Sequence, residues 1–412
     1  MQRMVGEKRL YLKSRTRPYS FRRCKSKRVR STNIESLPDD VLFHVLACLP
    51  ADYLYDIARL VCRRWYHIIH SHAFVSTQIQ RSTSYGLLLS CYSLFESGHP
   101  VFVNATQCGR IETSVLSYKC RMSILCSCEG LGLEFQLDFN CSRVPHIINP
   151  ATKQVFKLPS FPSRPGIRIN YYLGCGFAYA AASMEYKVVL PLTEGDRRLE
   201  KIASVAILTA GVDTSWRHIP VESLSPDGRG LLSNYPLITE GFIHWVGDMS
   251  NRVVTLDVET EVLTMSEVPL PPPQPESFSH DTRDSNYFLS TGRFLTLVVA
   301  NRGLRWQFWG MEPGTGEWRK VLPDVKLKRC RFKHVGSKEE KKLFAREDDG
   351  CLEPVGWVKY PEVLALRFSE DSGGRTCIFY NLDTREINST VLPSPCAAHR
   401  ASPHKNNLMW LS

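Results

Sequence analysis

Residues 37–69 read LPDDVLFHVLACLPADYLYDIARLVCRRWYHII and contain three short helical patterns. Apolar residues recur at three-to-four spacing across 41–49, which is typical of one face of a helix. Pro50 ends this pattern because proline cannot continue a helix. A second apolar stripe follows across 54–61 and a third across 65–69.

The helical module that contains this stretch is roughly 45 residues long, close to the size below which a segment needs a metal, a disulfide or a partner to stay folded. Three short helices carry more apolar surface here than they can hide from water by themselves. Exposed apolar surface of this kind marks a protein-interaction site. The pattern therefore predicts a helical module that completes its core on another protein.

The two Leu-Pro pairs at 37–38 and 49–50, with the Val-Cys-Arg-x-Trp ending at 61–65, resemble an F-box. An F-box links a protein to the small adaptor of a cullin–RING ubiquitin ligase. The adaptor-binding residues that the resemblance implies are Leu37, Pro38, Val41, Leu42, Val45, Leu49, Pro50, Leu54, Val61, Cys62 and Trp65. Cys62 is expected to be a small buried side chain and not a nucleophile. The alternative interpretation is a helical hairpin inside a larger core.

Almost all of the net charge lies at the N-terminus. Residues 1–31 hold twelve of the 52 Lys and Arg residues and one of the 41 acidic residues, so the rest of the chain has 40 of each sign. Residues 1–33 show no periodicity and are predicted to be a disordered tail. Its nuclear-localisation candidates are Arg22, Arg23, Lys25, Lys27, Arg28 and Arg30, which predicts a nuclear or cytoplasmic protein, or both. A solvated tail without a targeting role and a transit peptide are the alternatives.

Cysteine usage and hydropathy bound the compartment. The 14 cysteines include no C-x-x-C pair, which favours free, mostly buried thiols in a reducing compartment over a disulfide framework. No apolar run is long enough to span a membrane, so no membrane association is expected. The histidines of the HIIHSH stretch at 67–72 are expected at a helix end, with metal ligation as the less favoured alternative. We expect neither a metal site nor a cofactor.

From Tyr85 onward, short β-branched and aromatic runs replace the helical stripes, separated by Gly, Pro, Asn and Asp. A repeat consisting of a polar turn, a large residue and then a proline occurs at 149–159, 213–220, 258–271, 314–323 and 381–393. The spacing of the turns is typical of four-stranded blades of about 40 to 50 residues. Each polar turn is predicted to be the tip of a hairpin, and Trp216, Trp245 and Trp318 are predicted to be buried between sheets.

These copies resemble the F-box-associated region of plant F-box proteins, a β-propeller-like domain related to kelch repeats. The residues that carry the resemblance are 126–131, 148–153, 158–159, 176–179, 186–189 and 241–245. The kelch double-glycine signature is missing from most copies. The predicted fold class is α+β and multidomain: a helical F-box at 34–81, then an all-β, six- or seven-bladed propeller-like domain at 82–412.

Catalytic motifs are missing: the sequence contains no G-x-S-x-G, H-E-x-x-H or P-loop. The resemblance implies a non-catalytic substrate receptor of an SCF-type cullin–RING ubiquitin ligase. Its F-box would dock on the adaptor, and through it on the cullin and RING subunits, while the propeller binds an unidentified protein target. The alternative is a nucleic-acid-associated propeller scaffold that uses the basic tail. A neutral charge balance outside the tail makes nucleic-acid binding the less favoured function.

Overall fold

The structure is a computed structural model that describes residues 34–411, apart from 83–84, 91–97, 107–108, 121–123, 138–142, 163–166, 170–173, 195–200, 248–250, 270–284, 302–304, 327–330, 333–351, 369–375 and 392–399. The nuclear-localisation candidates at 22–30 lie outside the described residues. The chain forms two compact units, 1–42 and 43–412. The predicted domain boundaries at 33–34 and 81–82 stay a prediction. Across the described stretches, no helix is long and apolar enough to cross a membrane.

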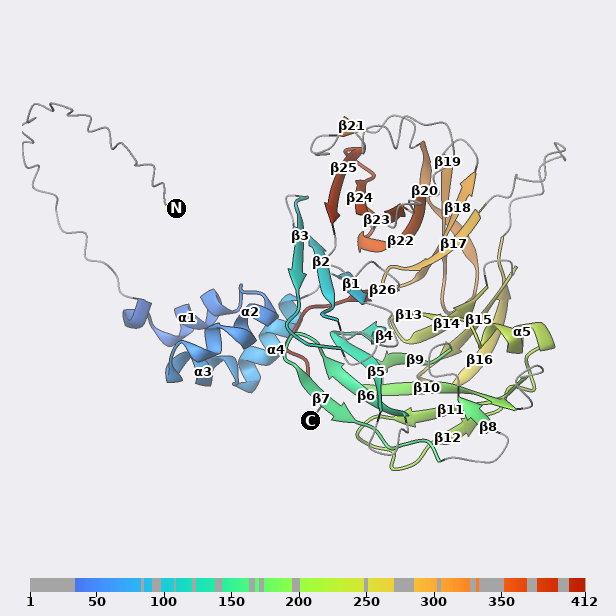
Figure 1. The fold of residues 1–412 in the computed structure, drawn as a ribbon, viewed down its shortest axis with the longest axis horizontal. Helices are drawn as coiled ribbons and strands as arrows, with labels where there is room; N and C mark the ends of the chain where they lie inside the picture. Colours follow the sequence, from blue (N-terminus) through green and yellow to red (C-terminus); the bar gives the residue numbers. More distant parts are fainter. Residues whose placement is uncertain are drawn as a thin grey trace, which may run out of the picture. The chain divides into compact units, whose positions relative to one another are not determined.

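Short helices make up the first part of the chain (Figure 1). They are η1 (Ile34–Ser36), α1 (Asp39–Leu46), α2 (Ala51–Asp56), η2 (Ala58–Leu60), α3 (Arg63–Ile69) and α4 (His72–Arg81). Two acidic residues in the first turn of α1 complement the positive end of its dipole. The second apolar stripe is not one helix, because the backbone at Ile57 (φ −122°, ψ −60°) leaves the helical region between α2 and η2.

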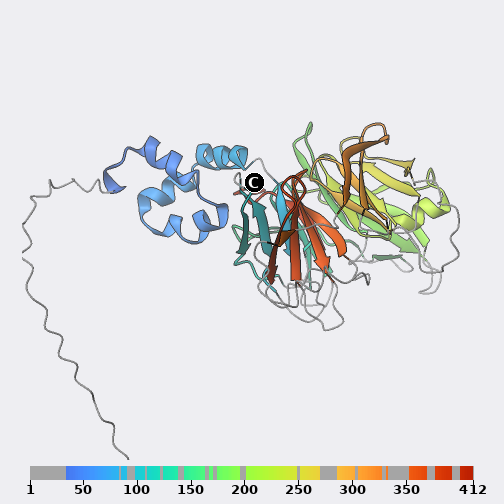
Figure 2. The same cartoon turned by 90° about the horizontal axis from the view of Figure 1, so that it is seen from above.

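Six sheets, the blades, follow the helices, and each has antiparallel strands at its centre (Figures 1 and 2). From the inside outward, blade 1 contains β26 (Arg400–His404), β1 (Gly86–Ser90), β2 (Val101–Ala105) and β3 (Ile111–Val115). Blade 2 contains β4 (Ile124–Cys128), β5 (Leu131–Leu137), β6 (Arg143–Asn149) and β7 (Gln154–Lys157). Blade 3 contains β9 (Gly176–Ala180), β10 (Glu185–Glu194), β11 (Lys201–Thr209) and β12 (Arg217–Ile219), and β8 (Ile167–Ile169) also pairs with β10.

The remaining blades repeat this order. Blade 4 follows α5 (Pro226–Leu231) and contains β13 (Pro236–Thr239), β14 (Phe242–Val246), β15 (Arg252–Asp257) and β16 (Val262–Glu267). Blade 5 contains β17 (Ser285–Ser290), β18 (Leu295–Asn301), β19 (Arg305–Met311) and β20 (Trp318–Lys326). Blade 6 contains β22 (Leu352–Lys359), β23 (Val363–Phe368), β24 (Thr376–Asn381) and β25 (Glu386–Val391), with β21 (Arg331–Phe332) parallel to β25.

The blades close into a ring. The innermost strands contact one another in the cyclic order β26, β4, β9, β13, β17 and β22, and β22 contacts β26 in turn. The C-terminal strand β26 completes blade 1 by pairing antiparallel with β1, from Gly86 opposite His404 to Ser90 opposite Arg400. The predicted fold class is therefore confirmed, and the blade number is six.

The sequence repeat forms a hairpin, as predicted, and the structure shows that it is the outer hairpin of a blade. Its five copies fall at the turns β6–β7, β11–β12, β15–β16, β19–β20 and β24–β25. In the first of them, Asn149 Oδ1 accepts bonds from the backbone N–H groups two and three residues later, at 2.9 and 3.1 Å. Asp257 and Asn381 make the same pair of bonds. This Asx turn places the fifth residue at φ close to +60° in each of these three copies.

Tryptophan indoles join neighbouring blades through the core. Trp245 is fully buried and its Nε1 donates to Gly174 O at 2.8 Å in the preceding blade, while Trp216 is 8% exposed and donates to Pro159 O at 3.0 Å. The predicted burial of these two residues is confirmed. The prediction for Trp318 is wrong in degree, because this side chain at the start of β20 is only partly buried.

Candidate protein-interaction sites

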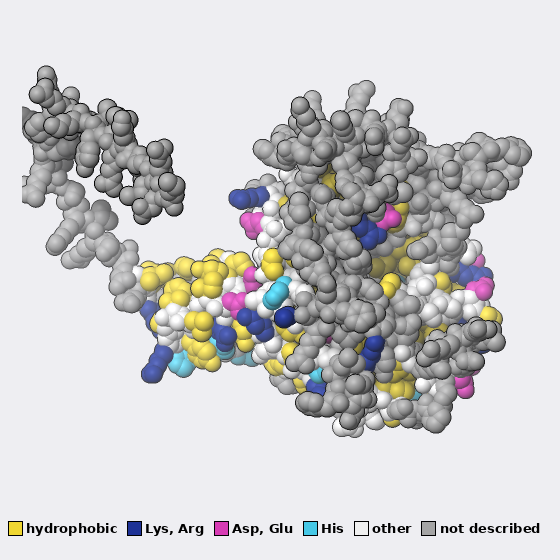
Figure 3. Space-filling model, viewed as in Figure 1, with side chains coloured by type: hydrophobic (Ala, Val, Ile, Leu, Met, Phe, Trp, Pro, Cys, Tyr) yellow, Lys and Arg dark blue, Asp and Glu magenta, His cyan; other side chains and the backbone are white. Residues whose placement is uncertain are grey.

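The helices expose a set of large apolar side chains. Their interior is filled by residues such as Leu46, Leu54 and Phe74, which have no exposed surface. The exposed helical residues of the unit 43–412 are Val45, Tyr53, Ile57, Leu60, Val61 and Tyr66, with Leu60 70% and Val61 58% exposed. Figure 3 shows hydrophobic side chains gathered on the surface of the helical part. A surface so apolar is typical of a protein-binding site.

The residues predicted to bind an adaptor divide into three groups. Pro38, Val41, Val45, Pro50, Val61 and Cys62 are exposed, and Leu37, Leu49 and Trp65 are partly buried. Leu42 and Leu54 are completely buried, so we correct their assignment: they stabilise the chain's own interior and offer no surface to a partner. The prediction that Cys62 is buried is also wrong, because this residue lies at the exposed start of α3.

The residues predicted from the sequence did not include Leu60, which is the most exposed apolar residue of the helices. A regular helix across 54–61 would place Leu54, Ile57 and Val61 on one face. Because α2 ends at Asp56 and a separate short turn follows, Ile57, Leu60 and Val61 are exposed while Leu54 is buried. The high apolar content of residues 54–61 was the sequence signal that could have indicated an exposed apolar surface there.

Helices α2 and α4 are hydrogen-bonded to the C-terminal residues that follow β26. Asn406 Nδ2 donates to Asp52 Oδ1 at 3.0 Å, and the backbone N–H of Leu408 donates to the buried Gln78 Oε1 at 3.0 Å. Asp56 pairs with Lys153 Nζ at 2.6 Å, on the outer turn of blade 2. These contacts lie within the unit 43–412 and join its helices to the propeller.

An axial pocket of ≈ 200 Å³ lies where the inner strands of the blades end. The turns after β4 and β13 bring Glu129 and Glu240 to it, and blade 3 contributes Tyr179. Tyr85, just before β1, lies between the two carboxylates: its hydroxyl donates to Glu129 Oε1 at 2.6 Å and lies 3.4 Å from Glu240 Oε1. Burial and the neighbouring Glu129 carboxylate raise the pKa of Tyr85 well above its usual range, so the phenol stays protonated.

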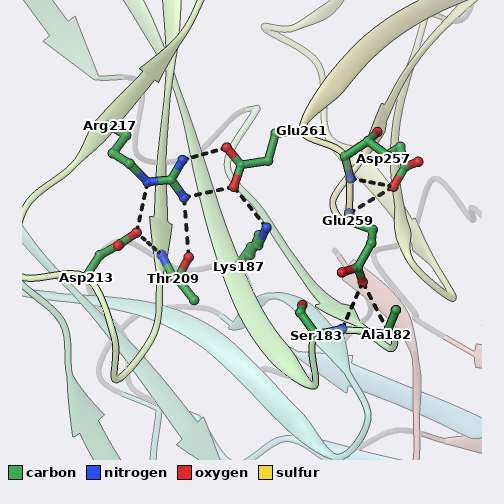
Figure 4. Close-up of polar contacts among 10 residues, drawn as sticks. Ala182, Ser183, Lys187, Thr209, Asp213, Arg217, Asp257, Glu259 and Glu261 are labelled. Carbon is green, nitrogen blue, oxygen red and sulfur yellow. Dashed lines mark hydrogen bonds and ion pairs between the residues drawn. The ribbon is translucent and has the colours of Figure 1, made fainter.

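A second polar cluster joins blades 3 and 4 (Figure 4). Arg217 donates to both carboxylate oxygens of Glu261, at 2.6 and 2.8 Å, and contacts Asp213 at 3.2 Å. Lys187, almost fully buried, donates to Glu261 at 2.9 Å. Each charge has an opposite partner, so this cluster stabilises the seam between the blades and leaves no free charge for a ligand.

The hydrogen bonds from Arg217 and Lys187 lower the pKa of Glu261 from 4.5 to about 2. A carboxylate with a depressed folded-state pKa stabilises the protein above pH 4.5 and loses this contribution as the pH falls towards 2. Replacing Glu261 with Gln should therefore lower the free energy of unfolding by about 1–3 kcal/mol at pH 7.

Denaturant unfolding of both proteins from pH 7 to pH 3 measures this difference, which should shrink below pH 4.5. Glu267→Gln, an exposed carboxylate on the neighbouring strand, is the matched control and should change little. A difference between Glu261→Gln and the unmodified chain that stays constant with pH would contradict the assignment.

The described residues offer few groups for metal binding or acid–base chemistry. Among the described residues, no three His, Cys, Asp or Glu side chains gather to hold a metal. Burial lowers the pKa of His244 and of His404 to about 3, so both are neutral. Thr239 and Thr255 each bond a ring nitrogen of His244 at 2.9 Å, which makes this histidine part of the core.

Known protein families match both the helical part and the propeller part of the chain. Residues 34–79 match the family model of F-box-like domains, and residues 90–342 match that of the F-box associated beta propeller domain. An Arabidopsis thaliana F-box protein is 26% identical over 251 residues, which cover 57% of this chain and 60% of that protein. The chain thus spans less than two thirds of the length of this relative.

Matching solved structures include two bacterial proteins of low sequence identity. TolB of Acinetobacter baumannii is 8% identical with a TM-score of 0.36, over 83% of this chain and 72% of that one. The periplasmic gluconolactonase PpgL of Pseudomonas aeruginosa is 11% identical with a TM-score of 0.34, over 78% of this chain and 97% of that one. Scores this low support no conclusion about this chain.

Proposed function

Because the chain belongs to the F-box-associated beta propeller family, we propose that it is the substrate-recognition subunit of an SCF-type cullin–RING E3 ubiquitin ligase. The helices at 34–81 dock on the adaptor, which connects them to the cullin and RING subunits. The propeller binds a protein target and brings it to ubiquitin chemistry that other subunits carry out. This chain then contributes proximity and no catalytic group.

The observation that carries the proposal is the exposed apolar surface of the helices. Leu60 and Val61 are both more than half exposed to water. Both lie within the segment that matches the F-box-like family model. Burying such side chains on a partner is favourable by about 25 cal/mol per Å² of apolar surface. The other exposed residues of the predicted set, Pro38, Val41, Val45, Pro50 and Cys62, are proposed to bind the adaptor as well, and so are the partly buried Leu37, Leu49 and Trp65.

Co-purification tests the proposal directly. The full chain, expressed with a recombinant SCF adaptor and the N-terminal half of a cullin, should elute with both from a size-exclusion column. The same chain without residues 34–81 should leave the complex. A full chain that elutes alone at micromolar concentrations of adaptor would overturn the proposal.

We also propose that the basic tail directs the chain to the nucleus. The reason is that residues 1–31 carry charge equal to the whole net charge of +11. Deleting residues 1–31 should move a fluorescent fusion from the nucleus to the cytoplasm without changing its thermal stability. Replacing the six basic residues at 22–30 with Gln should have the same effect. An unchanged distribution would identify a solvated tail without a targeting role, and import into an organelle would identify a transit peptide.

A further inference from the structure

We propose that the axial pocket binds one lysine or arginine side chain of the protein target. This inference rests on the proposed function and adds the chemical class of the target segment. The pocket lies at the ends of inner strands from several blades, where turns from different parts of the chain converge. Sites of this kind combine apolar walls with a few polar groups that set orientation and specificity.

Two Glu-Gly turns at the same place in their blades bring carboxylates to the pocket. Glu129-Gly130 connects β4 with β5, and Glu240-Gly241 connects β13 with β14, so each carboxylate lies between the first and second strands of its blade. Glu129 has φ +50°, a conformation that Asn or Gly adopts more readily than Glu. This turn holds the Glu129 carboxylate beside Lys405 and the Tyr85 hydroxyl.

The two carboxylates differ in how well they are neutralised. Lys405 Nζ binds both oxygens of Glu129, at 2.8 and 2.7 Å, and both side chains of this pair are largely buried. Glu129 and Lys405 together are therefore neutral. Tyr85 has one hydroxyl hydrogen, and the 2.6 Å contact assigns it to Glu129.

Glu240 receives no such hydrogen. Its Oε1 lies 3.4 Å from the oxygen of Tyr85, which has already donated its hydrogen, and 3.9 Å from Arg293 Nε. The Arg293 side chain is 68% exposed, so this long contact is screened by water and weak. Glu240, whose side chain is 54% exposed, thus has negative charge and free acceptor capacity at the rim of an apolar pocket.

The walls suit the stem of a cationic side chain. Ile238, Ala181 and Pro403 line the pocket with aliphatic groups, and Tyr179 adds an aromatic ring. Long cationic side chains bury their methylene groups on apolar surface and keep the charged end beside a polar partner. Aromatic rings also attract cations, as Lys405 shows by lying 4.4 Å from the centre of the Tyr85 ring.

The volume limits the occupant to one side chain. A space of ≈ 200 Å³ holds the volume of about seven liquid waters, which is too small for a folded element. An acidic occupant would face Glu240 without a counter-charge, and an aliphatic occupant would leave that carboxylate partly desolvated and unpaired. Lysine and arginine fit both the apolar walls and the rim charge.

Matched peptides test the inference on the full-length chain. The probes are acetylated, amidated heptapeptides of Gly and Ser that differ only in a central Lys, Arg, Gln or norleucine. Saturation-transfer NMR should detect the Lys and Arg peptides with at least fivefold tighter binding than the Gln and norleucine peptides. Glu240→Gln should weaken binding of the two cationic peptides at least fivefold and leave the norleucine peptide unchanged.

Two further variants control this result. Glu222→Gln removes an exposed carboxylate outside the pocket and should leave all four affinities unchanged. Arg293→Gln removes the competing cation and should tighten binding of the cationic peptides. Equal binding of the Lys and norleucine peptides, cation binding that survives Glu240→Gln, or no binding of any peptide would each overturn the inference.

Adaptor co-purification separates this result from the proposed function. Glu240→Gln should still co-purify with adaptor and cullin, because the pocket lies on the propeller. If the chain binds the adaptor but none of the cationic peptides, the pocket inference alone fails. If it binds the cationic peptides but no adaptor, the ligase assignment fails and the pocket stands as a binding site for basic side chains.

Discussion

Replacing Leu60 and Val61 together with Asp is expected to weaken binding of the SCF adaptor by roughly 100-fold or more. Each side chain contributes about 1.5–3 kcal/mol when it is buried in an apolar contact. A loss of about 1.4 kcal/mol changes an equilibrium constant tenfold, and the two introduced charges add a desolvation penalty. Isothermal titration of purified adaptor into each protein measures the change.

Folding must be unaffected for this result to count. Both residues are highly exposed, so the variant should keep the circular dichroism spectrum and melting temperature of the unmodified chain. Met184→Asp is the matched control, because Met184 is 76% exposed in a turn of the propeller and should not affect the adaptor. An adaptor affinity within twofold of the original would show that the F-box-like helices bind elsewhere.

Trp245→Ala should cost about 3–5 kcal/mol of folding free energy, which is enough to unfold many domains. The indole is fully buried at the seam between blades 3 and 4, and its removal leaves a cavity. The substitution also removes the donor of the 2.8 Å bond to Gly174 O, so a buried carbonyl loses its partner. We expect insoluble protein, or a soluble fraction with strongly reduced cooperativity in thermal unfolding.

Trp318→Ala provides the comparison. Trp318 is only partly buried at the start of β20, so the same substitution should cost clearly less and yield soluble, folded protein. Trp245→Phe keeps an aromatic ring but has no indole donor. Its loss of folding free energy should lie between the losses of the two alanine variants. Equal losses for Trp245→Ala and Trp318→Ala would contradict the assignment of Trp245 as an anchor between blades.

Local sequence patterns predict the hairpins of this fold well. The Asx turns at Asn149, Asp257 and Asn381 depend on a side-chain oxygen two and three residues from its donors, so four adjacent letters contain the whole interaction. Blade number is a different problem. It depends on whether β26 pairs with β1, and no pattern near either strand specifies a partner on the opposite end of the chain.

The interaction sites are harder to predict for the same physical reason. The axial pocket brings together Tyr85, Glu129, Tyr179 and Glu240, which are far apart in the sequence and lie in unremarkable local patterns. On the helices, a single non-helical residue at Ile57 decides which apolar side chains are exposed. The F-box resemblance therefore located the F-box-like segment, but the adaptor-binding residues that it implied included the buried Leu42 and Leu54.

Ring closure by β26 also determines when the protein can mature during synthesis. The strand that completes blade 1 is translated after every other blade, which takes on the order of tens of seconds at about 5–20 residues per second. Until then β1 lacks its inner neighbour, and the edge it presents is open to incorrect pairing with other chains. The helices emerge long before this moment. A nascent chain therefore displays its apolar helices while its propeller is still open.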